Sequence, residues 1–284
     1  MKIEYIRPYS EGKKSYFHYN RDNAEPIIPY FVMDGGAFFF MRDRLKVDNS
    51  NDLLELVMSG EFFKLWYVDG KFDWDMVFAQ PEQDTMRNFE WHIFLQRLYI
   101  LMPLAARFYS TGDEKYADKF YEILTAWMDA HPYEKFDASI SYFQTGFYWR
   151  DMQVAWRTLS LCISMFFLDK AFDKEKWQYL YDTLRLHADH LYEEAVAHEK
   201  KGDAQNHVLQ VGTALIYVGC LFPEFVNAKE YIRLGKIIVK QNLDKAIFAD
   251  GGSDEDSPSY SHFIARLYFI KITLQFGPYV LPQF

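Results

Sequence analysis

The chain has 284 residues, of which 50% are hydrophobic, 25% charged and 19% aromatic, and its formal net charge is −9. This balance is typical of a globular protein that buries a core, so disordered, low-complexity and collagen-like classes are excluded. Lys and Arg are scattered and form no basic block, which argues against a nucleic-acid partner. The apolar stretches are too short for a membrane span, and the first 30 residues contain no apolar run typical of a signal peptide.

The first segment is irregular, with strand-like alternation only in short pieces at residues 27–33 and 37–41. Apolar residues then recur every three or four positions for most of the chain, which predicts a mainly helical fold. A helix that starts at the caps in residues 49–51 is expected to end at Gly60.

Next, a long amphipathic helix is predicted over residues 85–109, with its end at Gly112. Another helix is predicted to start at Asp113-Glu114 and to end before His131-Pro132, because the residue before proline avoids the helical region. Further helices are expected at residues 148–167, 174–197, 206–221, 227–248 and 258–276.

The links between these helices are short, so consecutive helices should form antiparallel hairpins with wide apolar faces. A series of such hairpins must close into a ring or stack into a solenoid, and we expect a curved helical array. No internal linker is visible, so residues 1–284 are interpreted as a single domain. The chain stops at Phe284 soon after an apolar helix, which suggests that the domain belongs to a longer protein.

Two polar segments are candidates for chemistry. Asp203-Ala-Gln-Asn-His207 opens directly into an apolar helix, where Asn206 can be a functional amide or only an N-cap. The acidic segment 250–260 joins two predicted helices, and loops on rigid scaffolds often carry sites. It can also be a glycine helix end, a solvated turn and a helix begun by Pro258, with Tyr260 an ordinary amphipathic aromatic.

Together these segments resemble the helical domain of the heparinase II/III-like polysaccharide lyases, a family that also includes oligoalginate lyases. The resemblance covers roughly residues 89–276, and its specific part is Asn206-His207 with the Glu255-x-Ser-Pro-x-Tyr260 element. The other motifs are Phe89-Glu90-Trp91 through Arg97, Thr111 through Tyr116, Trp149 through Arg157, and Asp250-Gly251.

The resemblance implies an all-α fold, an incomplete α/α toroid, followed in the family by an antiparallel β-sandwich domain that is absent from this chain. It implies β-elimination at a uronic acid of an acidic polysaccharide such as heparan sulfate or alginate, and a periplasmic or secreted location. We expect this glycan and the missing domain of the same polypeptide as partners, and no nucleic acid, membrane, metal or cofactor.

Such an elimination requires a charge to offset the uronate, a base for the proton and an acid for the leaving oxygen. Asn206 can donate its amide hydrogens to the uronate, and His207 can add positive potential. Tyr260, with an unperturbed pKa near ~10, is neutral at pH 7 and can act as the general acid. No residue here matches the family's base from the sandwich domain.

Four residues are predicted to bind substrate. Arg97 and Arg157 occupy positions where the family carries arginine, and a guanidinium can hold a carboxylate or sulfate, although a helix salt bridge is the alternative. Trp149 can stack on a sugar ring or belong to the core. Glu255 is expected to orient its neighbours. Arg97, Arg150, Arg157 and His207 are predicted to form a basic strip.

His187 and His190 share a helix face at i, i+3, with Glu193, Glu194 and His198 downstream, which are residue types that suit zinc. Neither a cysteine pair nor a His-Glu-x-x-His spacing supports that interpretation. Residues 187–201 are therefore interpreted as a solvated helix face.

Two other functions fit a helical array. An inverting glycoside hydrolase would need two carboxyl groups about 6.5–9.5 Å apart, and its candidates are Glu90, Asp151, Asp250, Asp254, Glu255 and Asp256. A non-catalytic domain would bind glycan or protein through an aromatic concave face.

Overall fold

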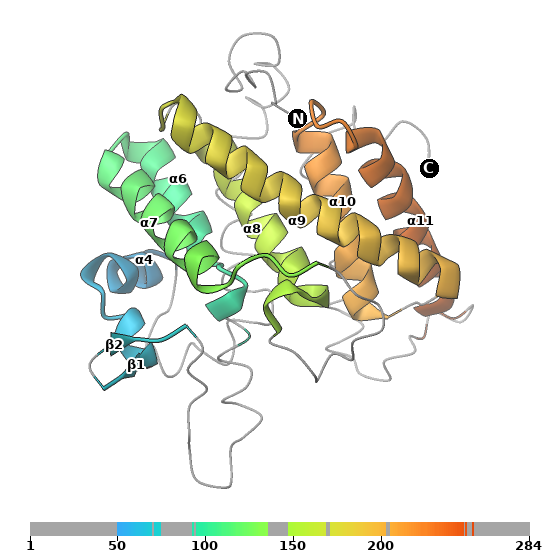
Figure 1. The fold of residues 1–284 in the computed structure, drawn as a ribbon, viewed down its shortest axis with the longest axis horizontal. Helices are drawn as coiled ribbons and strands as arrows, with labels where there is room; N and C mark the ends of the chain where they lie inside the picture. Colours follow the sequence, from blue (N-terminus) through green and yellow to red (C-terminus); the bar gives the residue numbers. More distant parts are fainter. Residues whose placement is uncertain are drawn as a thin grey trace, which may run out of the picture. The chain divides into compact units, whose positions relative to one another are not determined.

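The computed structural model describes residues 50–69, 71–74, 93, 95–135, 147–168, 171–202, 205–246, 248 and 252. Its helices are α4 (Ser50–Ser59), α6 (Leu101–Thr111), α7 (Glu114–Ala130), α8 (Asp151–Phe167), α9 (Lys174–Lys201), α10 (Asn206–Leu221) and α11 (Ala228–Ala246) (Figure 1). Two short 3-10 helices, η2 (Phe63–Trp66) and η3 (Phe147–Trp149), accompany them. In this part of the chain the only strands are β1 (Tyr67–Val68) and β2 (Lys71–Phe72), which pair antiparallel. The prediction of a mainly helical fold is confirmed.

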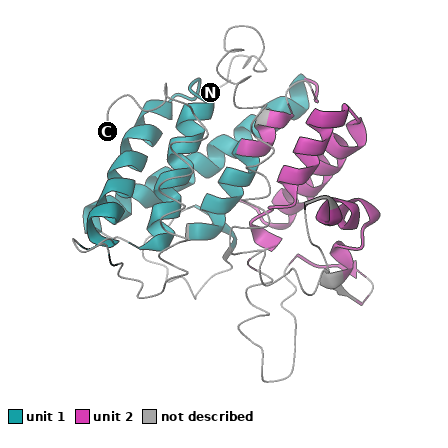
Figure 2. Cartoon of the chain, turned by 180° about the vertical axis from the view of Figure 1, so that it is seen from behind, with its two compact units in different colours: residues 1–22, 134–162, 174–284 teal, residues 23–133, 163–173 magenta. Residues whose placement is uncertain are grey.

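The chain divides into two compact units (Figure 2). Unit 1 consists of residues 1–22, 134–162 and 174–284, and unit 2 of residues 23–133 and 163–173. Asn206 and His207 belong to unit 1, whereas Arg97 belongs to unit 2.

In unit 2, helices α6 and α7 form a packed hairpin. Gly112 ends α6 with a left-handed φ of 69°, and Asp113 then caps α7 by accepting a hydrogen bond from the Lys115 backbone N–H. Beneath the hairpin, the buried Trp127 indole N–H donates to Gln96 Oε1 at 2.7 Å. Predictions for both ends of α7 and for the end of α6 are confirmed.

The predicted continuous helix over residues 85–109 is wrong in its middle. Residues 97–100 form a turn, Leu98 has a φ of 51°, and α6 begins only at Leu101. A residue with this φ cannot continue a right-handed helix. The apolar spacing persists across the turn, because Leu95 before it, Leu98 within it and Leu101 after it are all buried.

In unit 1, α10 is the central helix, and its residues from Val208 to Gly219 are all buried. It lies unusually close to α11. A Cβ atom added at Gly212 would lie 3.0 Å from the Gly235 carbonyl oxygen, and one at Gly235 would lie 2.6 Å from the Gly212 carbonyl oxygen. Side chains larger than hydrogen therefore do not fit at this crossing. Because the start of α10 lies beside the end of α11, the two helices form an antiparallel hairpin.

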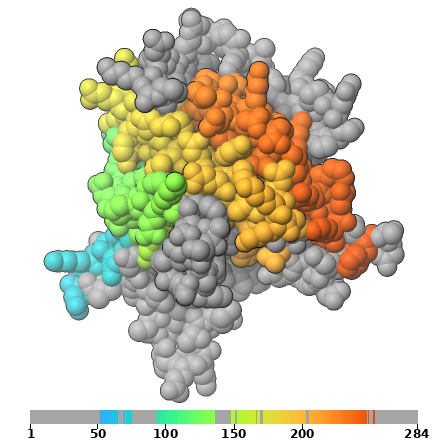
Figure 3. Space-filling view, turned by 45° about the vertical axis from the view of Figure 1, so that its right-hand side comes forward, coloured from blue at the N-terminus to red at the C-terminus, as the bar shows by residue number. Residues whose placement is uncertain are grey.

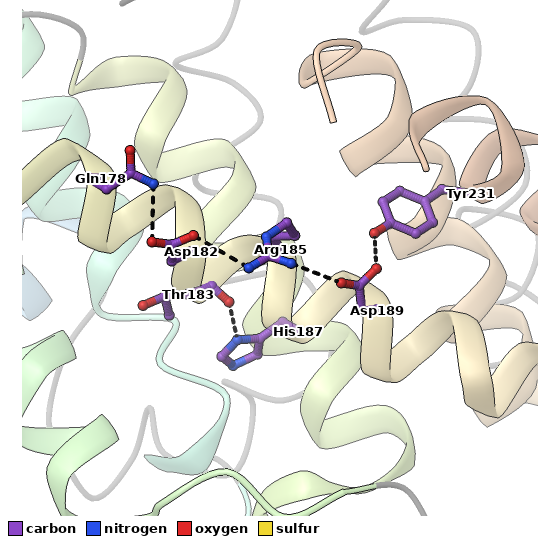
Figure 4. Close-up of polar contacts among 7 residues, drawn as sticks. All are labelled: Gln178, Asp182, Thr183, Arg185, His187, Asp189 and Tyr231. Atoms are coloured by element: carbon purple, nitrogen blue, oxygen red, sulfur yellow. Dashed lines mark hydrogen bonds and ion pairs between the residues drawn. The ribbon is translucent and has the colours of Figure 1, made fainter. Parts of the chain in front are cut away.

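Helix α9 packs on both members of this hairpin, and it lies beside α11 in the space-filling view (Figure 3). A polar network joins α9 to α11 (Figure 4). Asp189 accepts hydrogen bonds from the Tyr231 hydroxyl and from Asn227 Nδ2, and Arg185 forms an ion pair with it at 3.6 Å. Burial, together with the adjacent Asp189 carboxylate, raises the pKa of Tyr231 well above its usual value, so the phenol stays protonated.

Helix boundaries agree with prediction to within a few residues. Helix α10 has the predicted bounds, and α4 ends at Ser59, before Gly60. Helix α9 runs on to Lys201, and α11 ends at Ala246. The strand-like pieces at 27–33 and 37–41 and the helix predicted at 258–276 lie outside the described residues. None of the helices described has both the length and the hydropathy that a bilayer-spanning segment needs.

Candidate active site

Asn206 is the first residue of α10 and is not its cap. The N-cap is Gln205, whose backbone is extended (φ −150°, ψ 161°) and whose carbonyl accepts the first helical hydrogen bond from Leu209 at 3.0 Å. Asn206 and His207 are both partly exposed. The interpretation of Asn206 as an N-cap is therefore wrong.

This end of α10 has the electrostatic character that an anion requires. The first backbone N–H groups of a helix have no partner within it, and the macrodipole places about half a positive charge there. Asn206 and His207 are the first two residues of α10, so both lie at this positive end of the helix.

The second predicted segment begins at the same end of the hairpin. The Lys245 ammonium in the last turn of α11 donates to the carbonyl of Gly202, just before α10. The chain leaves α11 at Ala246, and the Phe248 backbone N–H then donates to the Gly252 carbonyl at 2.8 Å. The loop predicted to carry Glu255 and Tyr260 thus follows α11 at the end of the hairpin where α10 starts. Glu255 and Tyr260 themselves lie outside the described residues.

Trp149 and Arg157 come together in the interior. The Arg157 side chain is fully buried, and its guanidinium carbon lies 5.1 Å from the centroid of the Trp149 ring. Its Nε donates to His187 Nε2 at 2.8 Å, and its Nη2 donates to the Tyr148 carbonyl at 2.6 Å. The buried Arg157 guanidinium contacts protein groups and not solvent. The prediction that Arg157 belongs to a solvent-facing basic strip is therefore wrong.

The contact with Arg157 fixes the protonation state of His187. An arginine Nε always carries hydrogen, so His187 Nε2 must be the acceptor and its Nδ1 carries the ring hydrogen. Nδ1 accordingly donates to the Thr183 carbonyl at 2.8 Å (Figure 4). Burial and the neighbouring Arg157 cation hold the pKa of His187 well below its usual range. The imidazole is neutral, and both of its nitrogens are engaged.

His190 lies on the same side of α9. Its ring centroid is 5.9 Å from that of Trp149, and burial, followed by the Arg157 charge, lowers its pKa to about 4. His187, His190 and Glu194 are all buried, so the solvated-face interpretation of residues 187–201 is wrong for this side of the helix. The buried side could have been found, because Leu184, Leu191 and Ala195 continue the same apolar spacing.

A metal at these histidines finds no support. Within the described ranges, no group of three or more His, Cys, Asp or Glu side chains is placed to hold an ion. His187 also has no free lone pair, because Nε2 accepts from Arg157 and Nδ1 carries hydrogen.

Arg97 lies in unit 2 and is partly exposed. Burial raises the pKa of Tyr99 well above its usual value, and a hydrogen bond from Arg97 opposes that shift. For the glycoside hydrolase alternative, Glu90, Asp250, Asp254, Glu255 and Asp256 lie outside the described residues, as does the side chain of Asp151.

Comparisons with known proteins identify relatives of this chain. The chain is 27% identical to a heparin-sulfate lyase of Pedobacter heparinus over 179 residues, which are 62% of this chain and 25% of that protein. It is 27% identical to a heparin-sulfate lyase of Bacteroides stercoris over 183 residues, which are 60% of this chain and 26% of that protein. The chain thus spans about a quarter of the length of these relatives.

Two solved structures share the fold. The crystal structure of heparinase III matches with a TM-score of 0.60 and 22% identity, over 73% of this chain and 29% of that one. The heparan sulfate lyase HepC from Pedobacter heparinus matches with a TM-score of 0.55 and 21% identity, over 93% of this chain and 42% of that one. These likenesses confirm the expected fold class, all-α and of the incomplete α/α toroid type.

The family model described as heparinase II/III N-terminus matches residues 9–275. That match covers almost the whole chain and includes every residue of the candidate site. The protein therefore belongs to the heparinase II/III N-terminus family.

Proposed function

We propose that the protein is a polysaccharide lyase that cleaves heparan sulfate by β-elimination. The observation that carries the proposal is the Asn206-His207 pair at the positive end of α10, partly exposed and not used as a cap, in a chain of the heparinase family. Two relatives named heparin-sulfate lyases favour heparan sulfate over alginate.

In the proposed reaction, a base removes the proton from the carbon beside the uronate carboxyl group. The electron pair forms the new carbon–carbon double bond as the bond to the glycosidic oxygen breaks, and Tyr260 gives that oxygen a proton. Charge builds on the carboxylate in the transition state. The Asn206 amide and the dipole of α10 oppose that charge, and His207 adds a second donor.

The remaining predicted residues have supporting roles in the proposal. Arg97 binds an acidic group of the glycan, and Glu255 orients the Tyr260 loop. Trp149 and Arg157 are buried against each other, so their proposed contribution is to hold the segment around η3 in place for the substrate.

The chain spans about a quarter of its relatives, and we propose that the base comes from a β-sandwich domain elsewhere in the same polypeptide. A periplasmic or secreted location fits an enzyme whose substrate and partner is an extracellular acidic polysaccharide.

The test uses the full-length protein with heparan sulfate and, for comparison, alginate. Cleavage by elimination generates the ultraviolet absorbance of an unsaturated uronate, whereas hydrolysis yields new reducing ends without it. Asn206→Ala and Tyr260→Phe should each lower kcat by about 10²- to 10³-fold, the typical effect of losing one transition-state donor. Asn227→Ala, at the other end of the α10–α11 hairpin, is the matched control and should retain activity. Full activity of Asn206→Ala would refute the assigned site, and reducing ends without absorbance would refute the reaction.

A further inference from the structure

Three exposed lysines gather where α9 and α11 end. Lys200 and Lys201 are the last two residues of α9, and Lys245 lies in the last turn of α11. The Lys245 ammonium donates to the carbonyl of Gly202, the residue directly after Lys201. Because consecutive Cα atoms are about 3.8 Å apart, the Lys245 charge lies within a few ångströms of the Lys201 backbone. We call these three residues the terminal lysine patch.

The charge of this patch is not neutralised by the carboxylates described around it. Throughout the described ranges, none of the three lysines forms an ion pair, whereas Lys240 pairs with Asp244 at 2.5 Å on the same helix as Lys245. The nearby acids act on other groups. Glu194 faces His198 at 3.6 Å, and Glu199 acts on Arg233.

Like charges on neighbouring exposed residues repel one another over a range of about 8 Å at physiological salt, which lowers stability, and a bound anion reduces that repulsion. The three lysines place positive charge on a protein whose net charge is −9. Clustered positive charge attracts a polyanion.

The patch borders the candidate active site. Gly202, to which Lys245 is bonded, precedes Asn206 by four residues, and the positive end of α10 adds to the same field. A glycan chain whose uronate lies at Asn206 would therefore place neighbouring acidic groups near the lysines.

We propose that Lys200, Lys201 and Lys245 form an anion subsite that holds sulfate groups of the polysaccharide beside the sugar bound at Asn206. This inference rests on the proposed function and identifies residues that bind the sugars next to the reacting one. An ammonium is a compact point charge without the fixed fork of arginine, so the subsite recognises charge density more than a particular sulfation pattern. Lys245 has a second task, because its bond to Gly202 joins the end of α11 to the turn that precedes Asn206.

The experiment compares the full-length wild-type protein with Lys200→Gln/Lys201→Gln and with the triple variant that adds Lys245→Gln. Lys229→Gln is the matched control, since Lys229 is an exposed lysine at the opposite end of the hairpin. Each protein is titrated with heparan sulfate and with its desulfated form at low and high NaCl, and cleavage kinetics are recorded in parallel.

At low salt we expect the triple variant to bind heparan sulfate about tenfold more weakly, since exposed charge pairs contribute little individually and add up here. KM should rise by a similar factor with kcat unchanged, and the difference should vanish at high salt because exposed charges are screened. Lys229→Gln should match wild type. The double variant should show part of the effect, which separates the subsite from the structural bond of Lys245.

Equal affinity and equal salt dependence in wild type and the triple variant would overturn the subsite, even if cleavage continues. Equal losses for heparan sulfate and its desulfated form would show that carboxylates and not sulfates are held, which overturns the sulfate assignment. Absence of cleavage by wild type would refute the proposed function instead, while the binding titration would still test whether the terminal lysine patch binds sulfate.

Discussion

Replacing His187 with phenylalanine removes the acceptor of the buried Arg157 Nε–H group while it keeps an aromatic ring against Trp149. In the native protein the ring centroids of Trp149 and His187 lie 4.6 Å apart, so phenylalanine retains most of that packing. What disappears is the 2.8 Å hydrogen bond from Arg157 and the 2.8 Å bond to the Thr183 carbonyl.

The magnitude follows from which group is left without a partner. A hydrogen bond to a charged group contributes about 1.5–3 kcal/mol, and an unsatisfied buried charged donor costs at least as much. The Thr183 carbonyl lies within α9 and keeps its helical hydrogen bond, so losing the bond from His187 Nδ1 adds only about 0.5 kcal/mol. We expect His187→Phe to destabilise the protein by about 2–4 kcal/mol, or to lower Tm by roughly 5–15 °C.

The assay is thermal and urea unfolding of the full-length protein, followed by the helical signal in far-ultraviolet circular dichroism. His198→Phe is the matched control, because His198 lies on the same helix, is partly exposed and contacts Glu194 at 3.6 Å. The control should lose no more than about 1 kcal/mol. Arg157→Met/His187→Phe should be no less stable than His187→Phe, because the double variant removes the unsatisfied cation as well. Equal stability of His187→Phe and His198→Phe would refute the buried Arg157–His187 bond.

Two other predictions follow from the interior of unit 1. The folded protein holds the pKa of His190 at about 4, so the unfolded chain, with a pKa near ~6.5, takes up a proton first as pH falls. His190 should therefore contribute no pH dependence above pH ~6.5 and about 3 kcal/mol of lost stability by pH ~4, in addition to the loss from His187. His190→Phe should make the decline in urea unfolding shallower, whereas an unchanged slope would contradict the assignment. Gly212→Ala should destabilise by about 1–3 kcal/mol, because its Cβ would lie 2.8 Å from Ile238 Cγ2. A Tm equal to that of wild type would show that α10 and α11 are not so close.

Local sequence determined much of the helical framework. The Gly112-Asp113 pair and the His131-Pro132 pair predict both ends of α7, because each carries a local conformational preference. The turn at residues 97–100 was missed, since burial of Leu98 maintains the apolar period through a non-helical backbone. Periodicity reports which side chains are buried and not whether every hydrogen bond of the helix forms.

The interior of the candidate site depended on distant partners. Arg157 and His187 are 30 residues apart, and nothing near Arg157 in the sequence indicates that its guanidinium is hydrogen-bonded within the core. Asn206 could be located at the start of α10 from the onset of the apolar run, but only the backbone of Gln205 shows which residue is the cap. The roles of Glu255 and Tyr260 stay predictions.

We propose that the start of α10 stabilises a uronate during elimination. The most direct measurement is the rate at which full-length wild-type protein and Asn206→Ala generate unsaturated uronate absorbance from heparan sulfate, at equal protein concentration and with folding verified by circular dichroism. Wild type should accumulate the absorbance steadily, and Asn206→Ala should lose about 10²- to 10³-fold in kcat. No absorbance from wild type, or equal rates from both proteins, would contradict it.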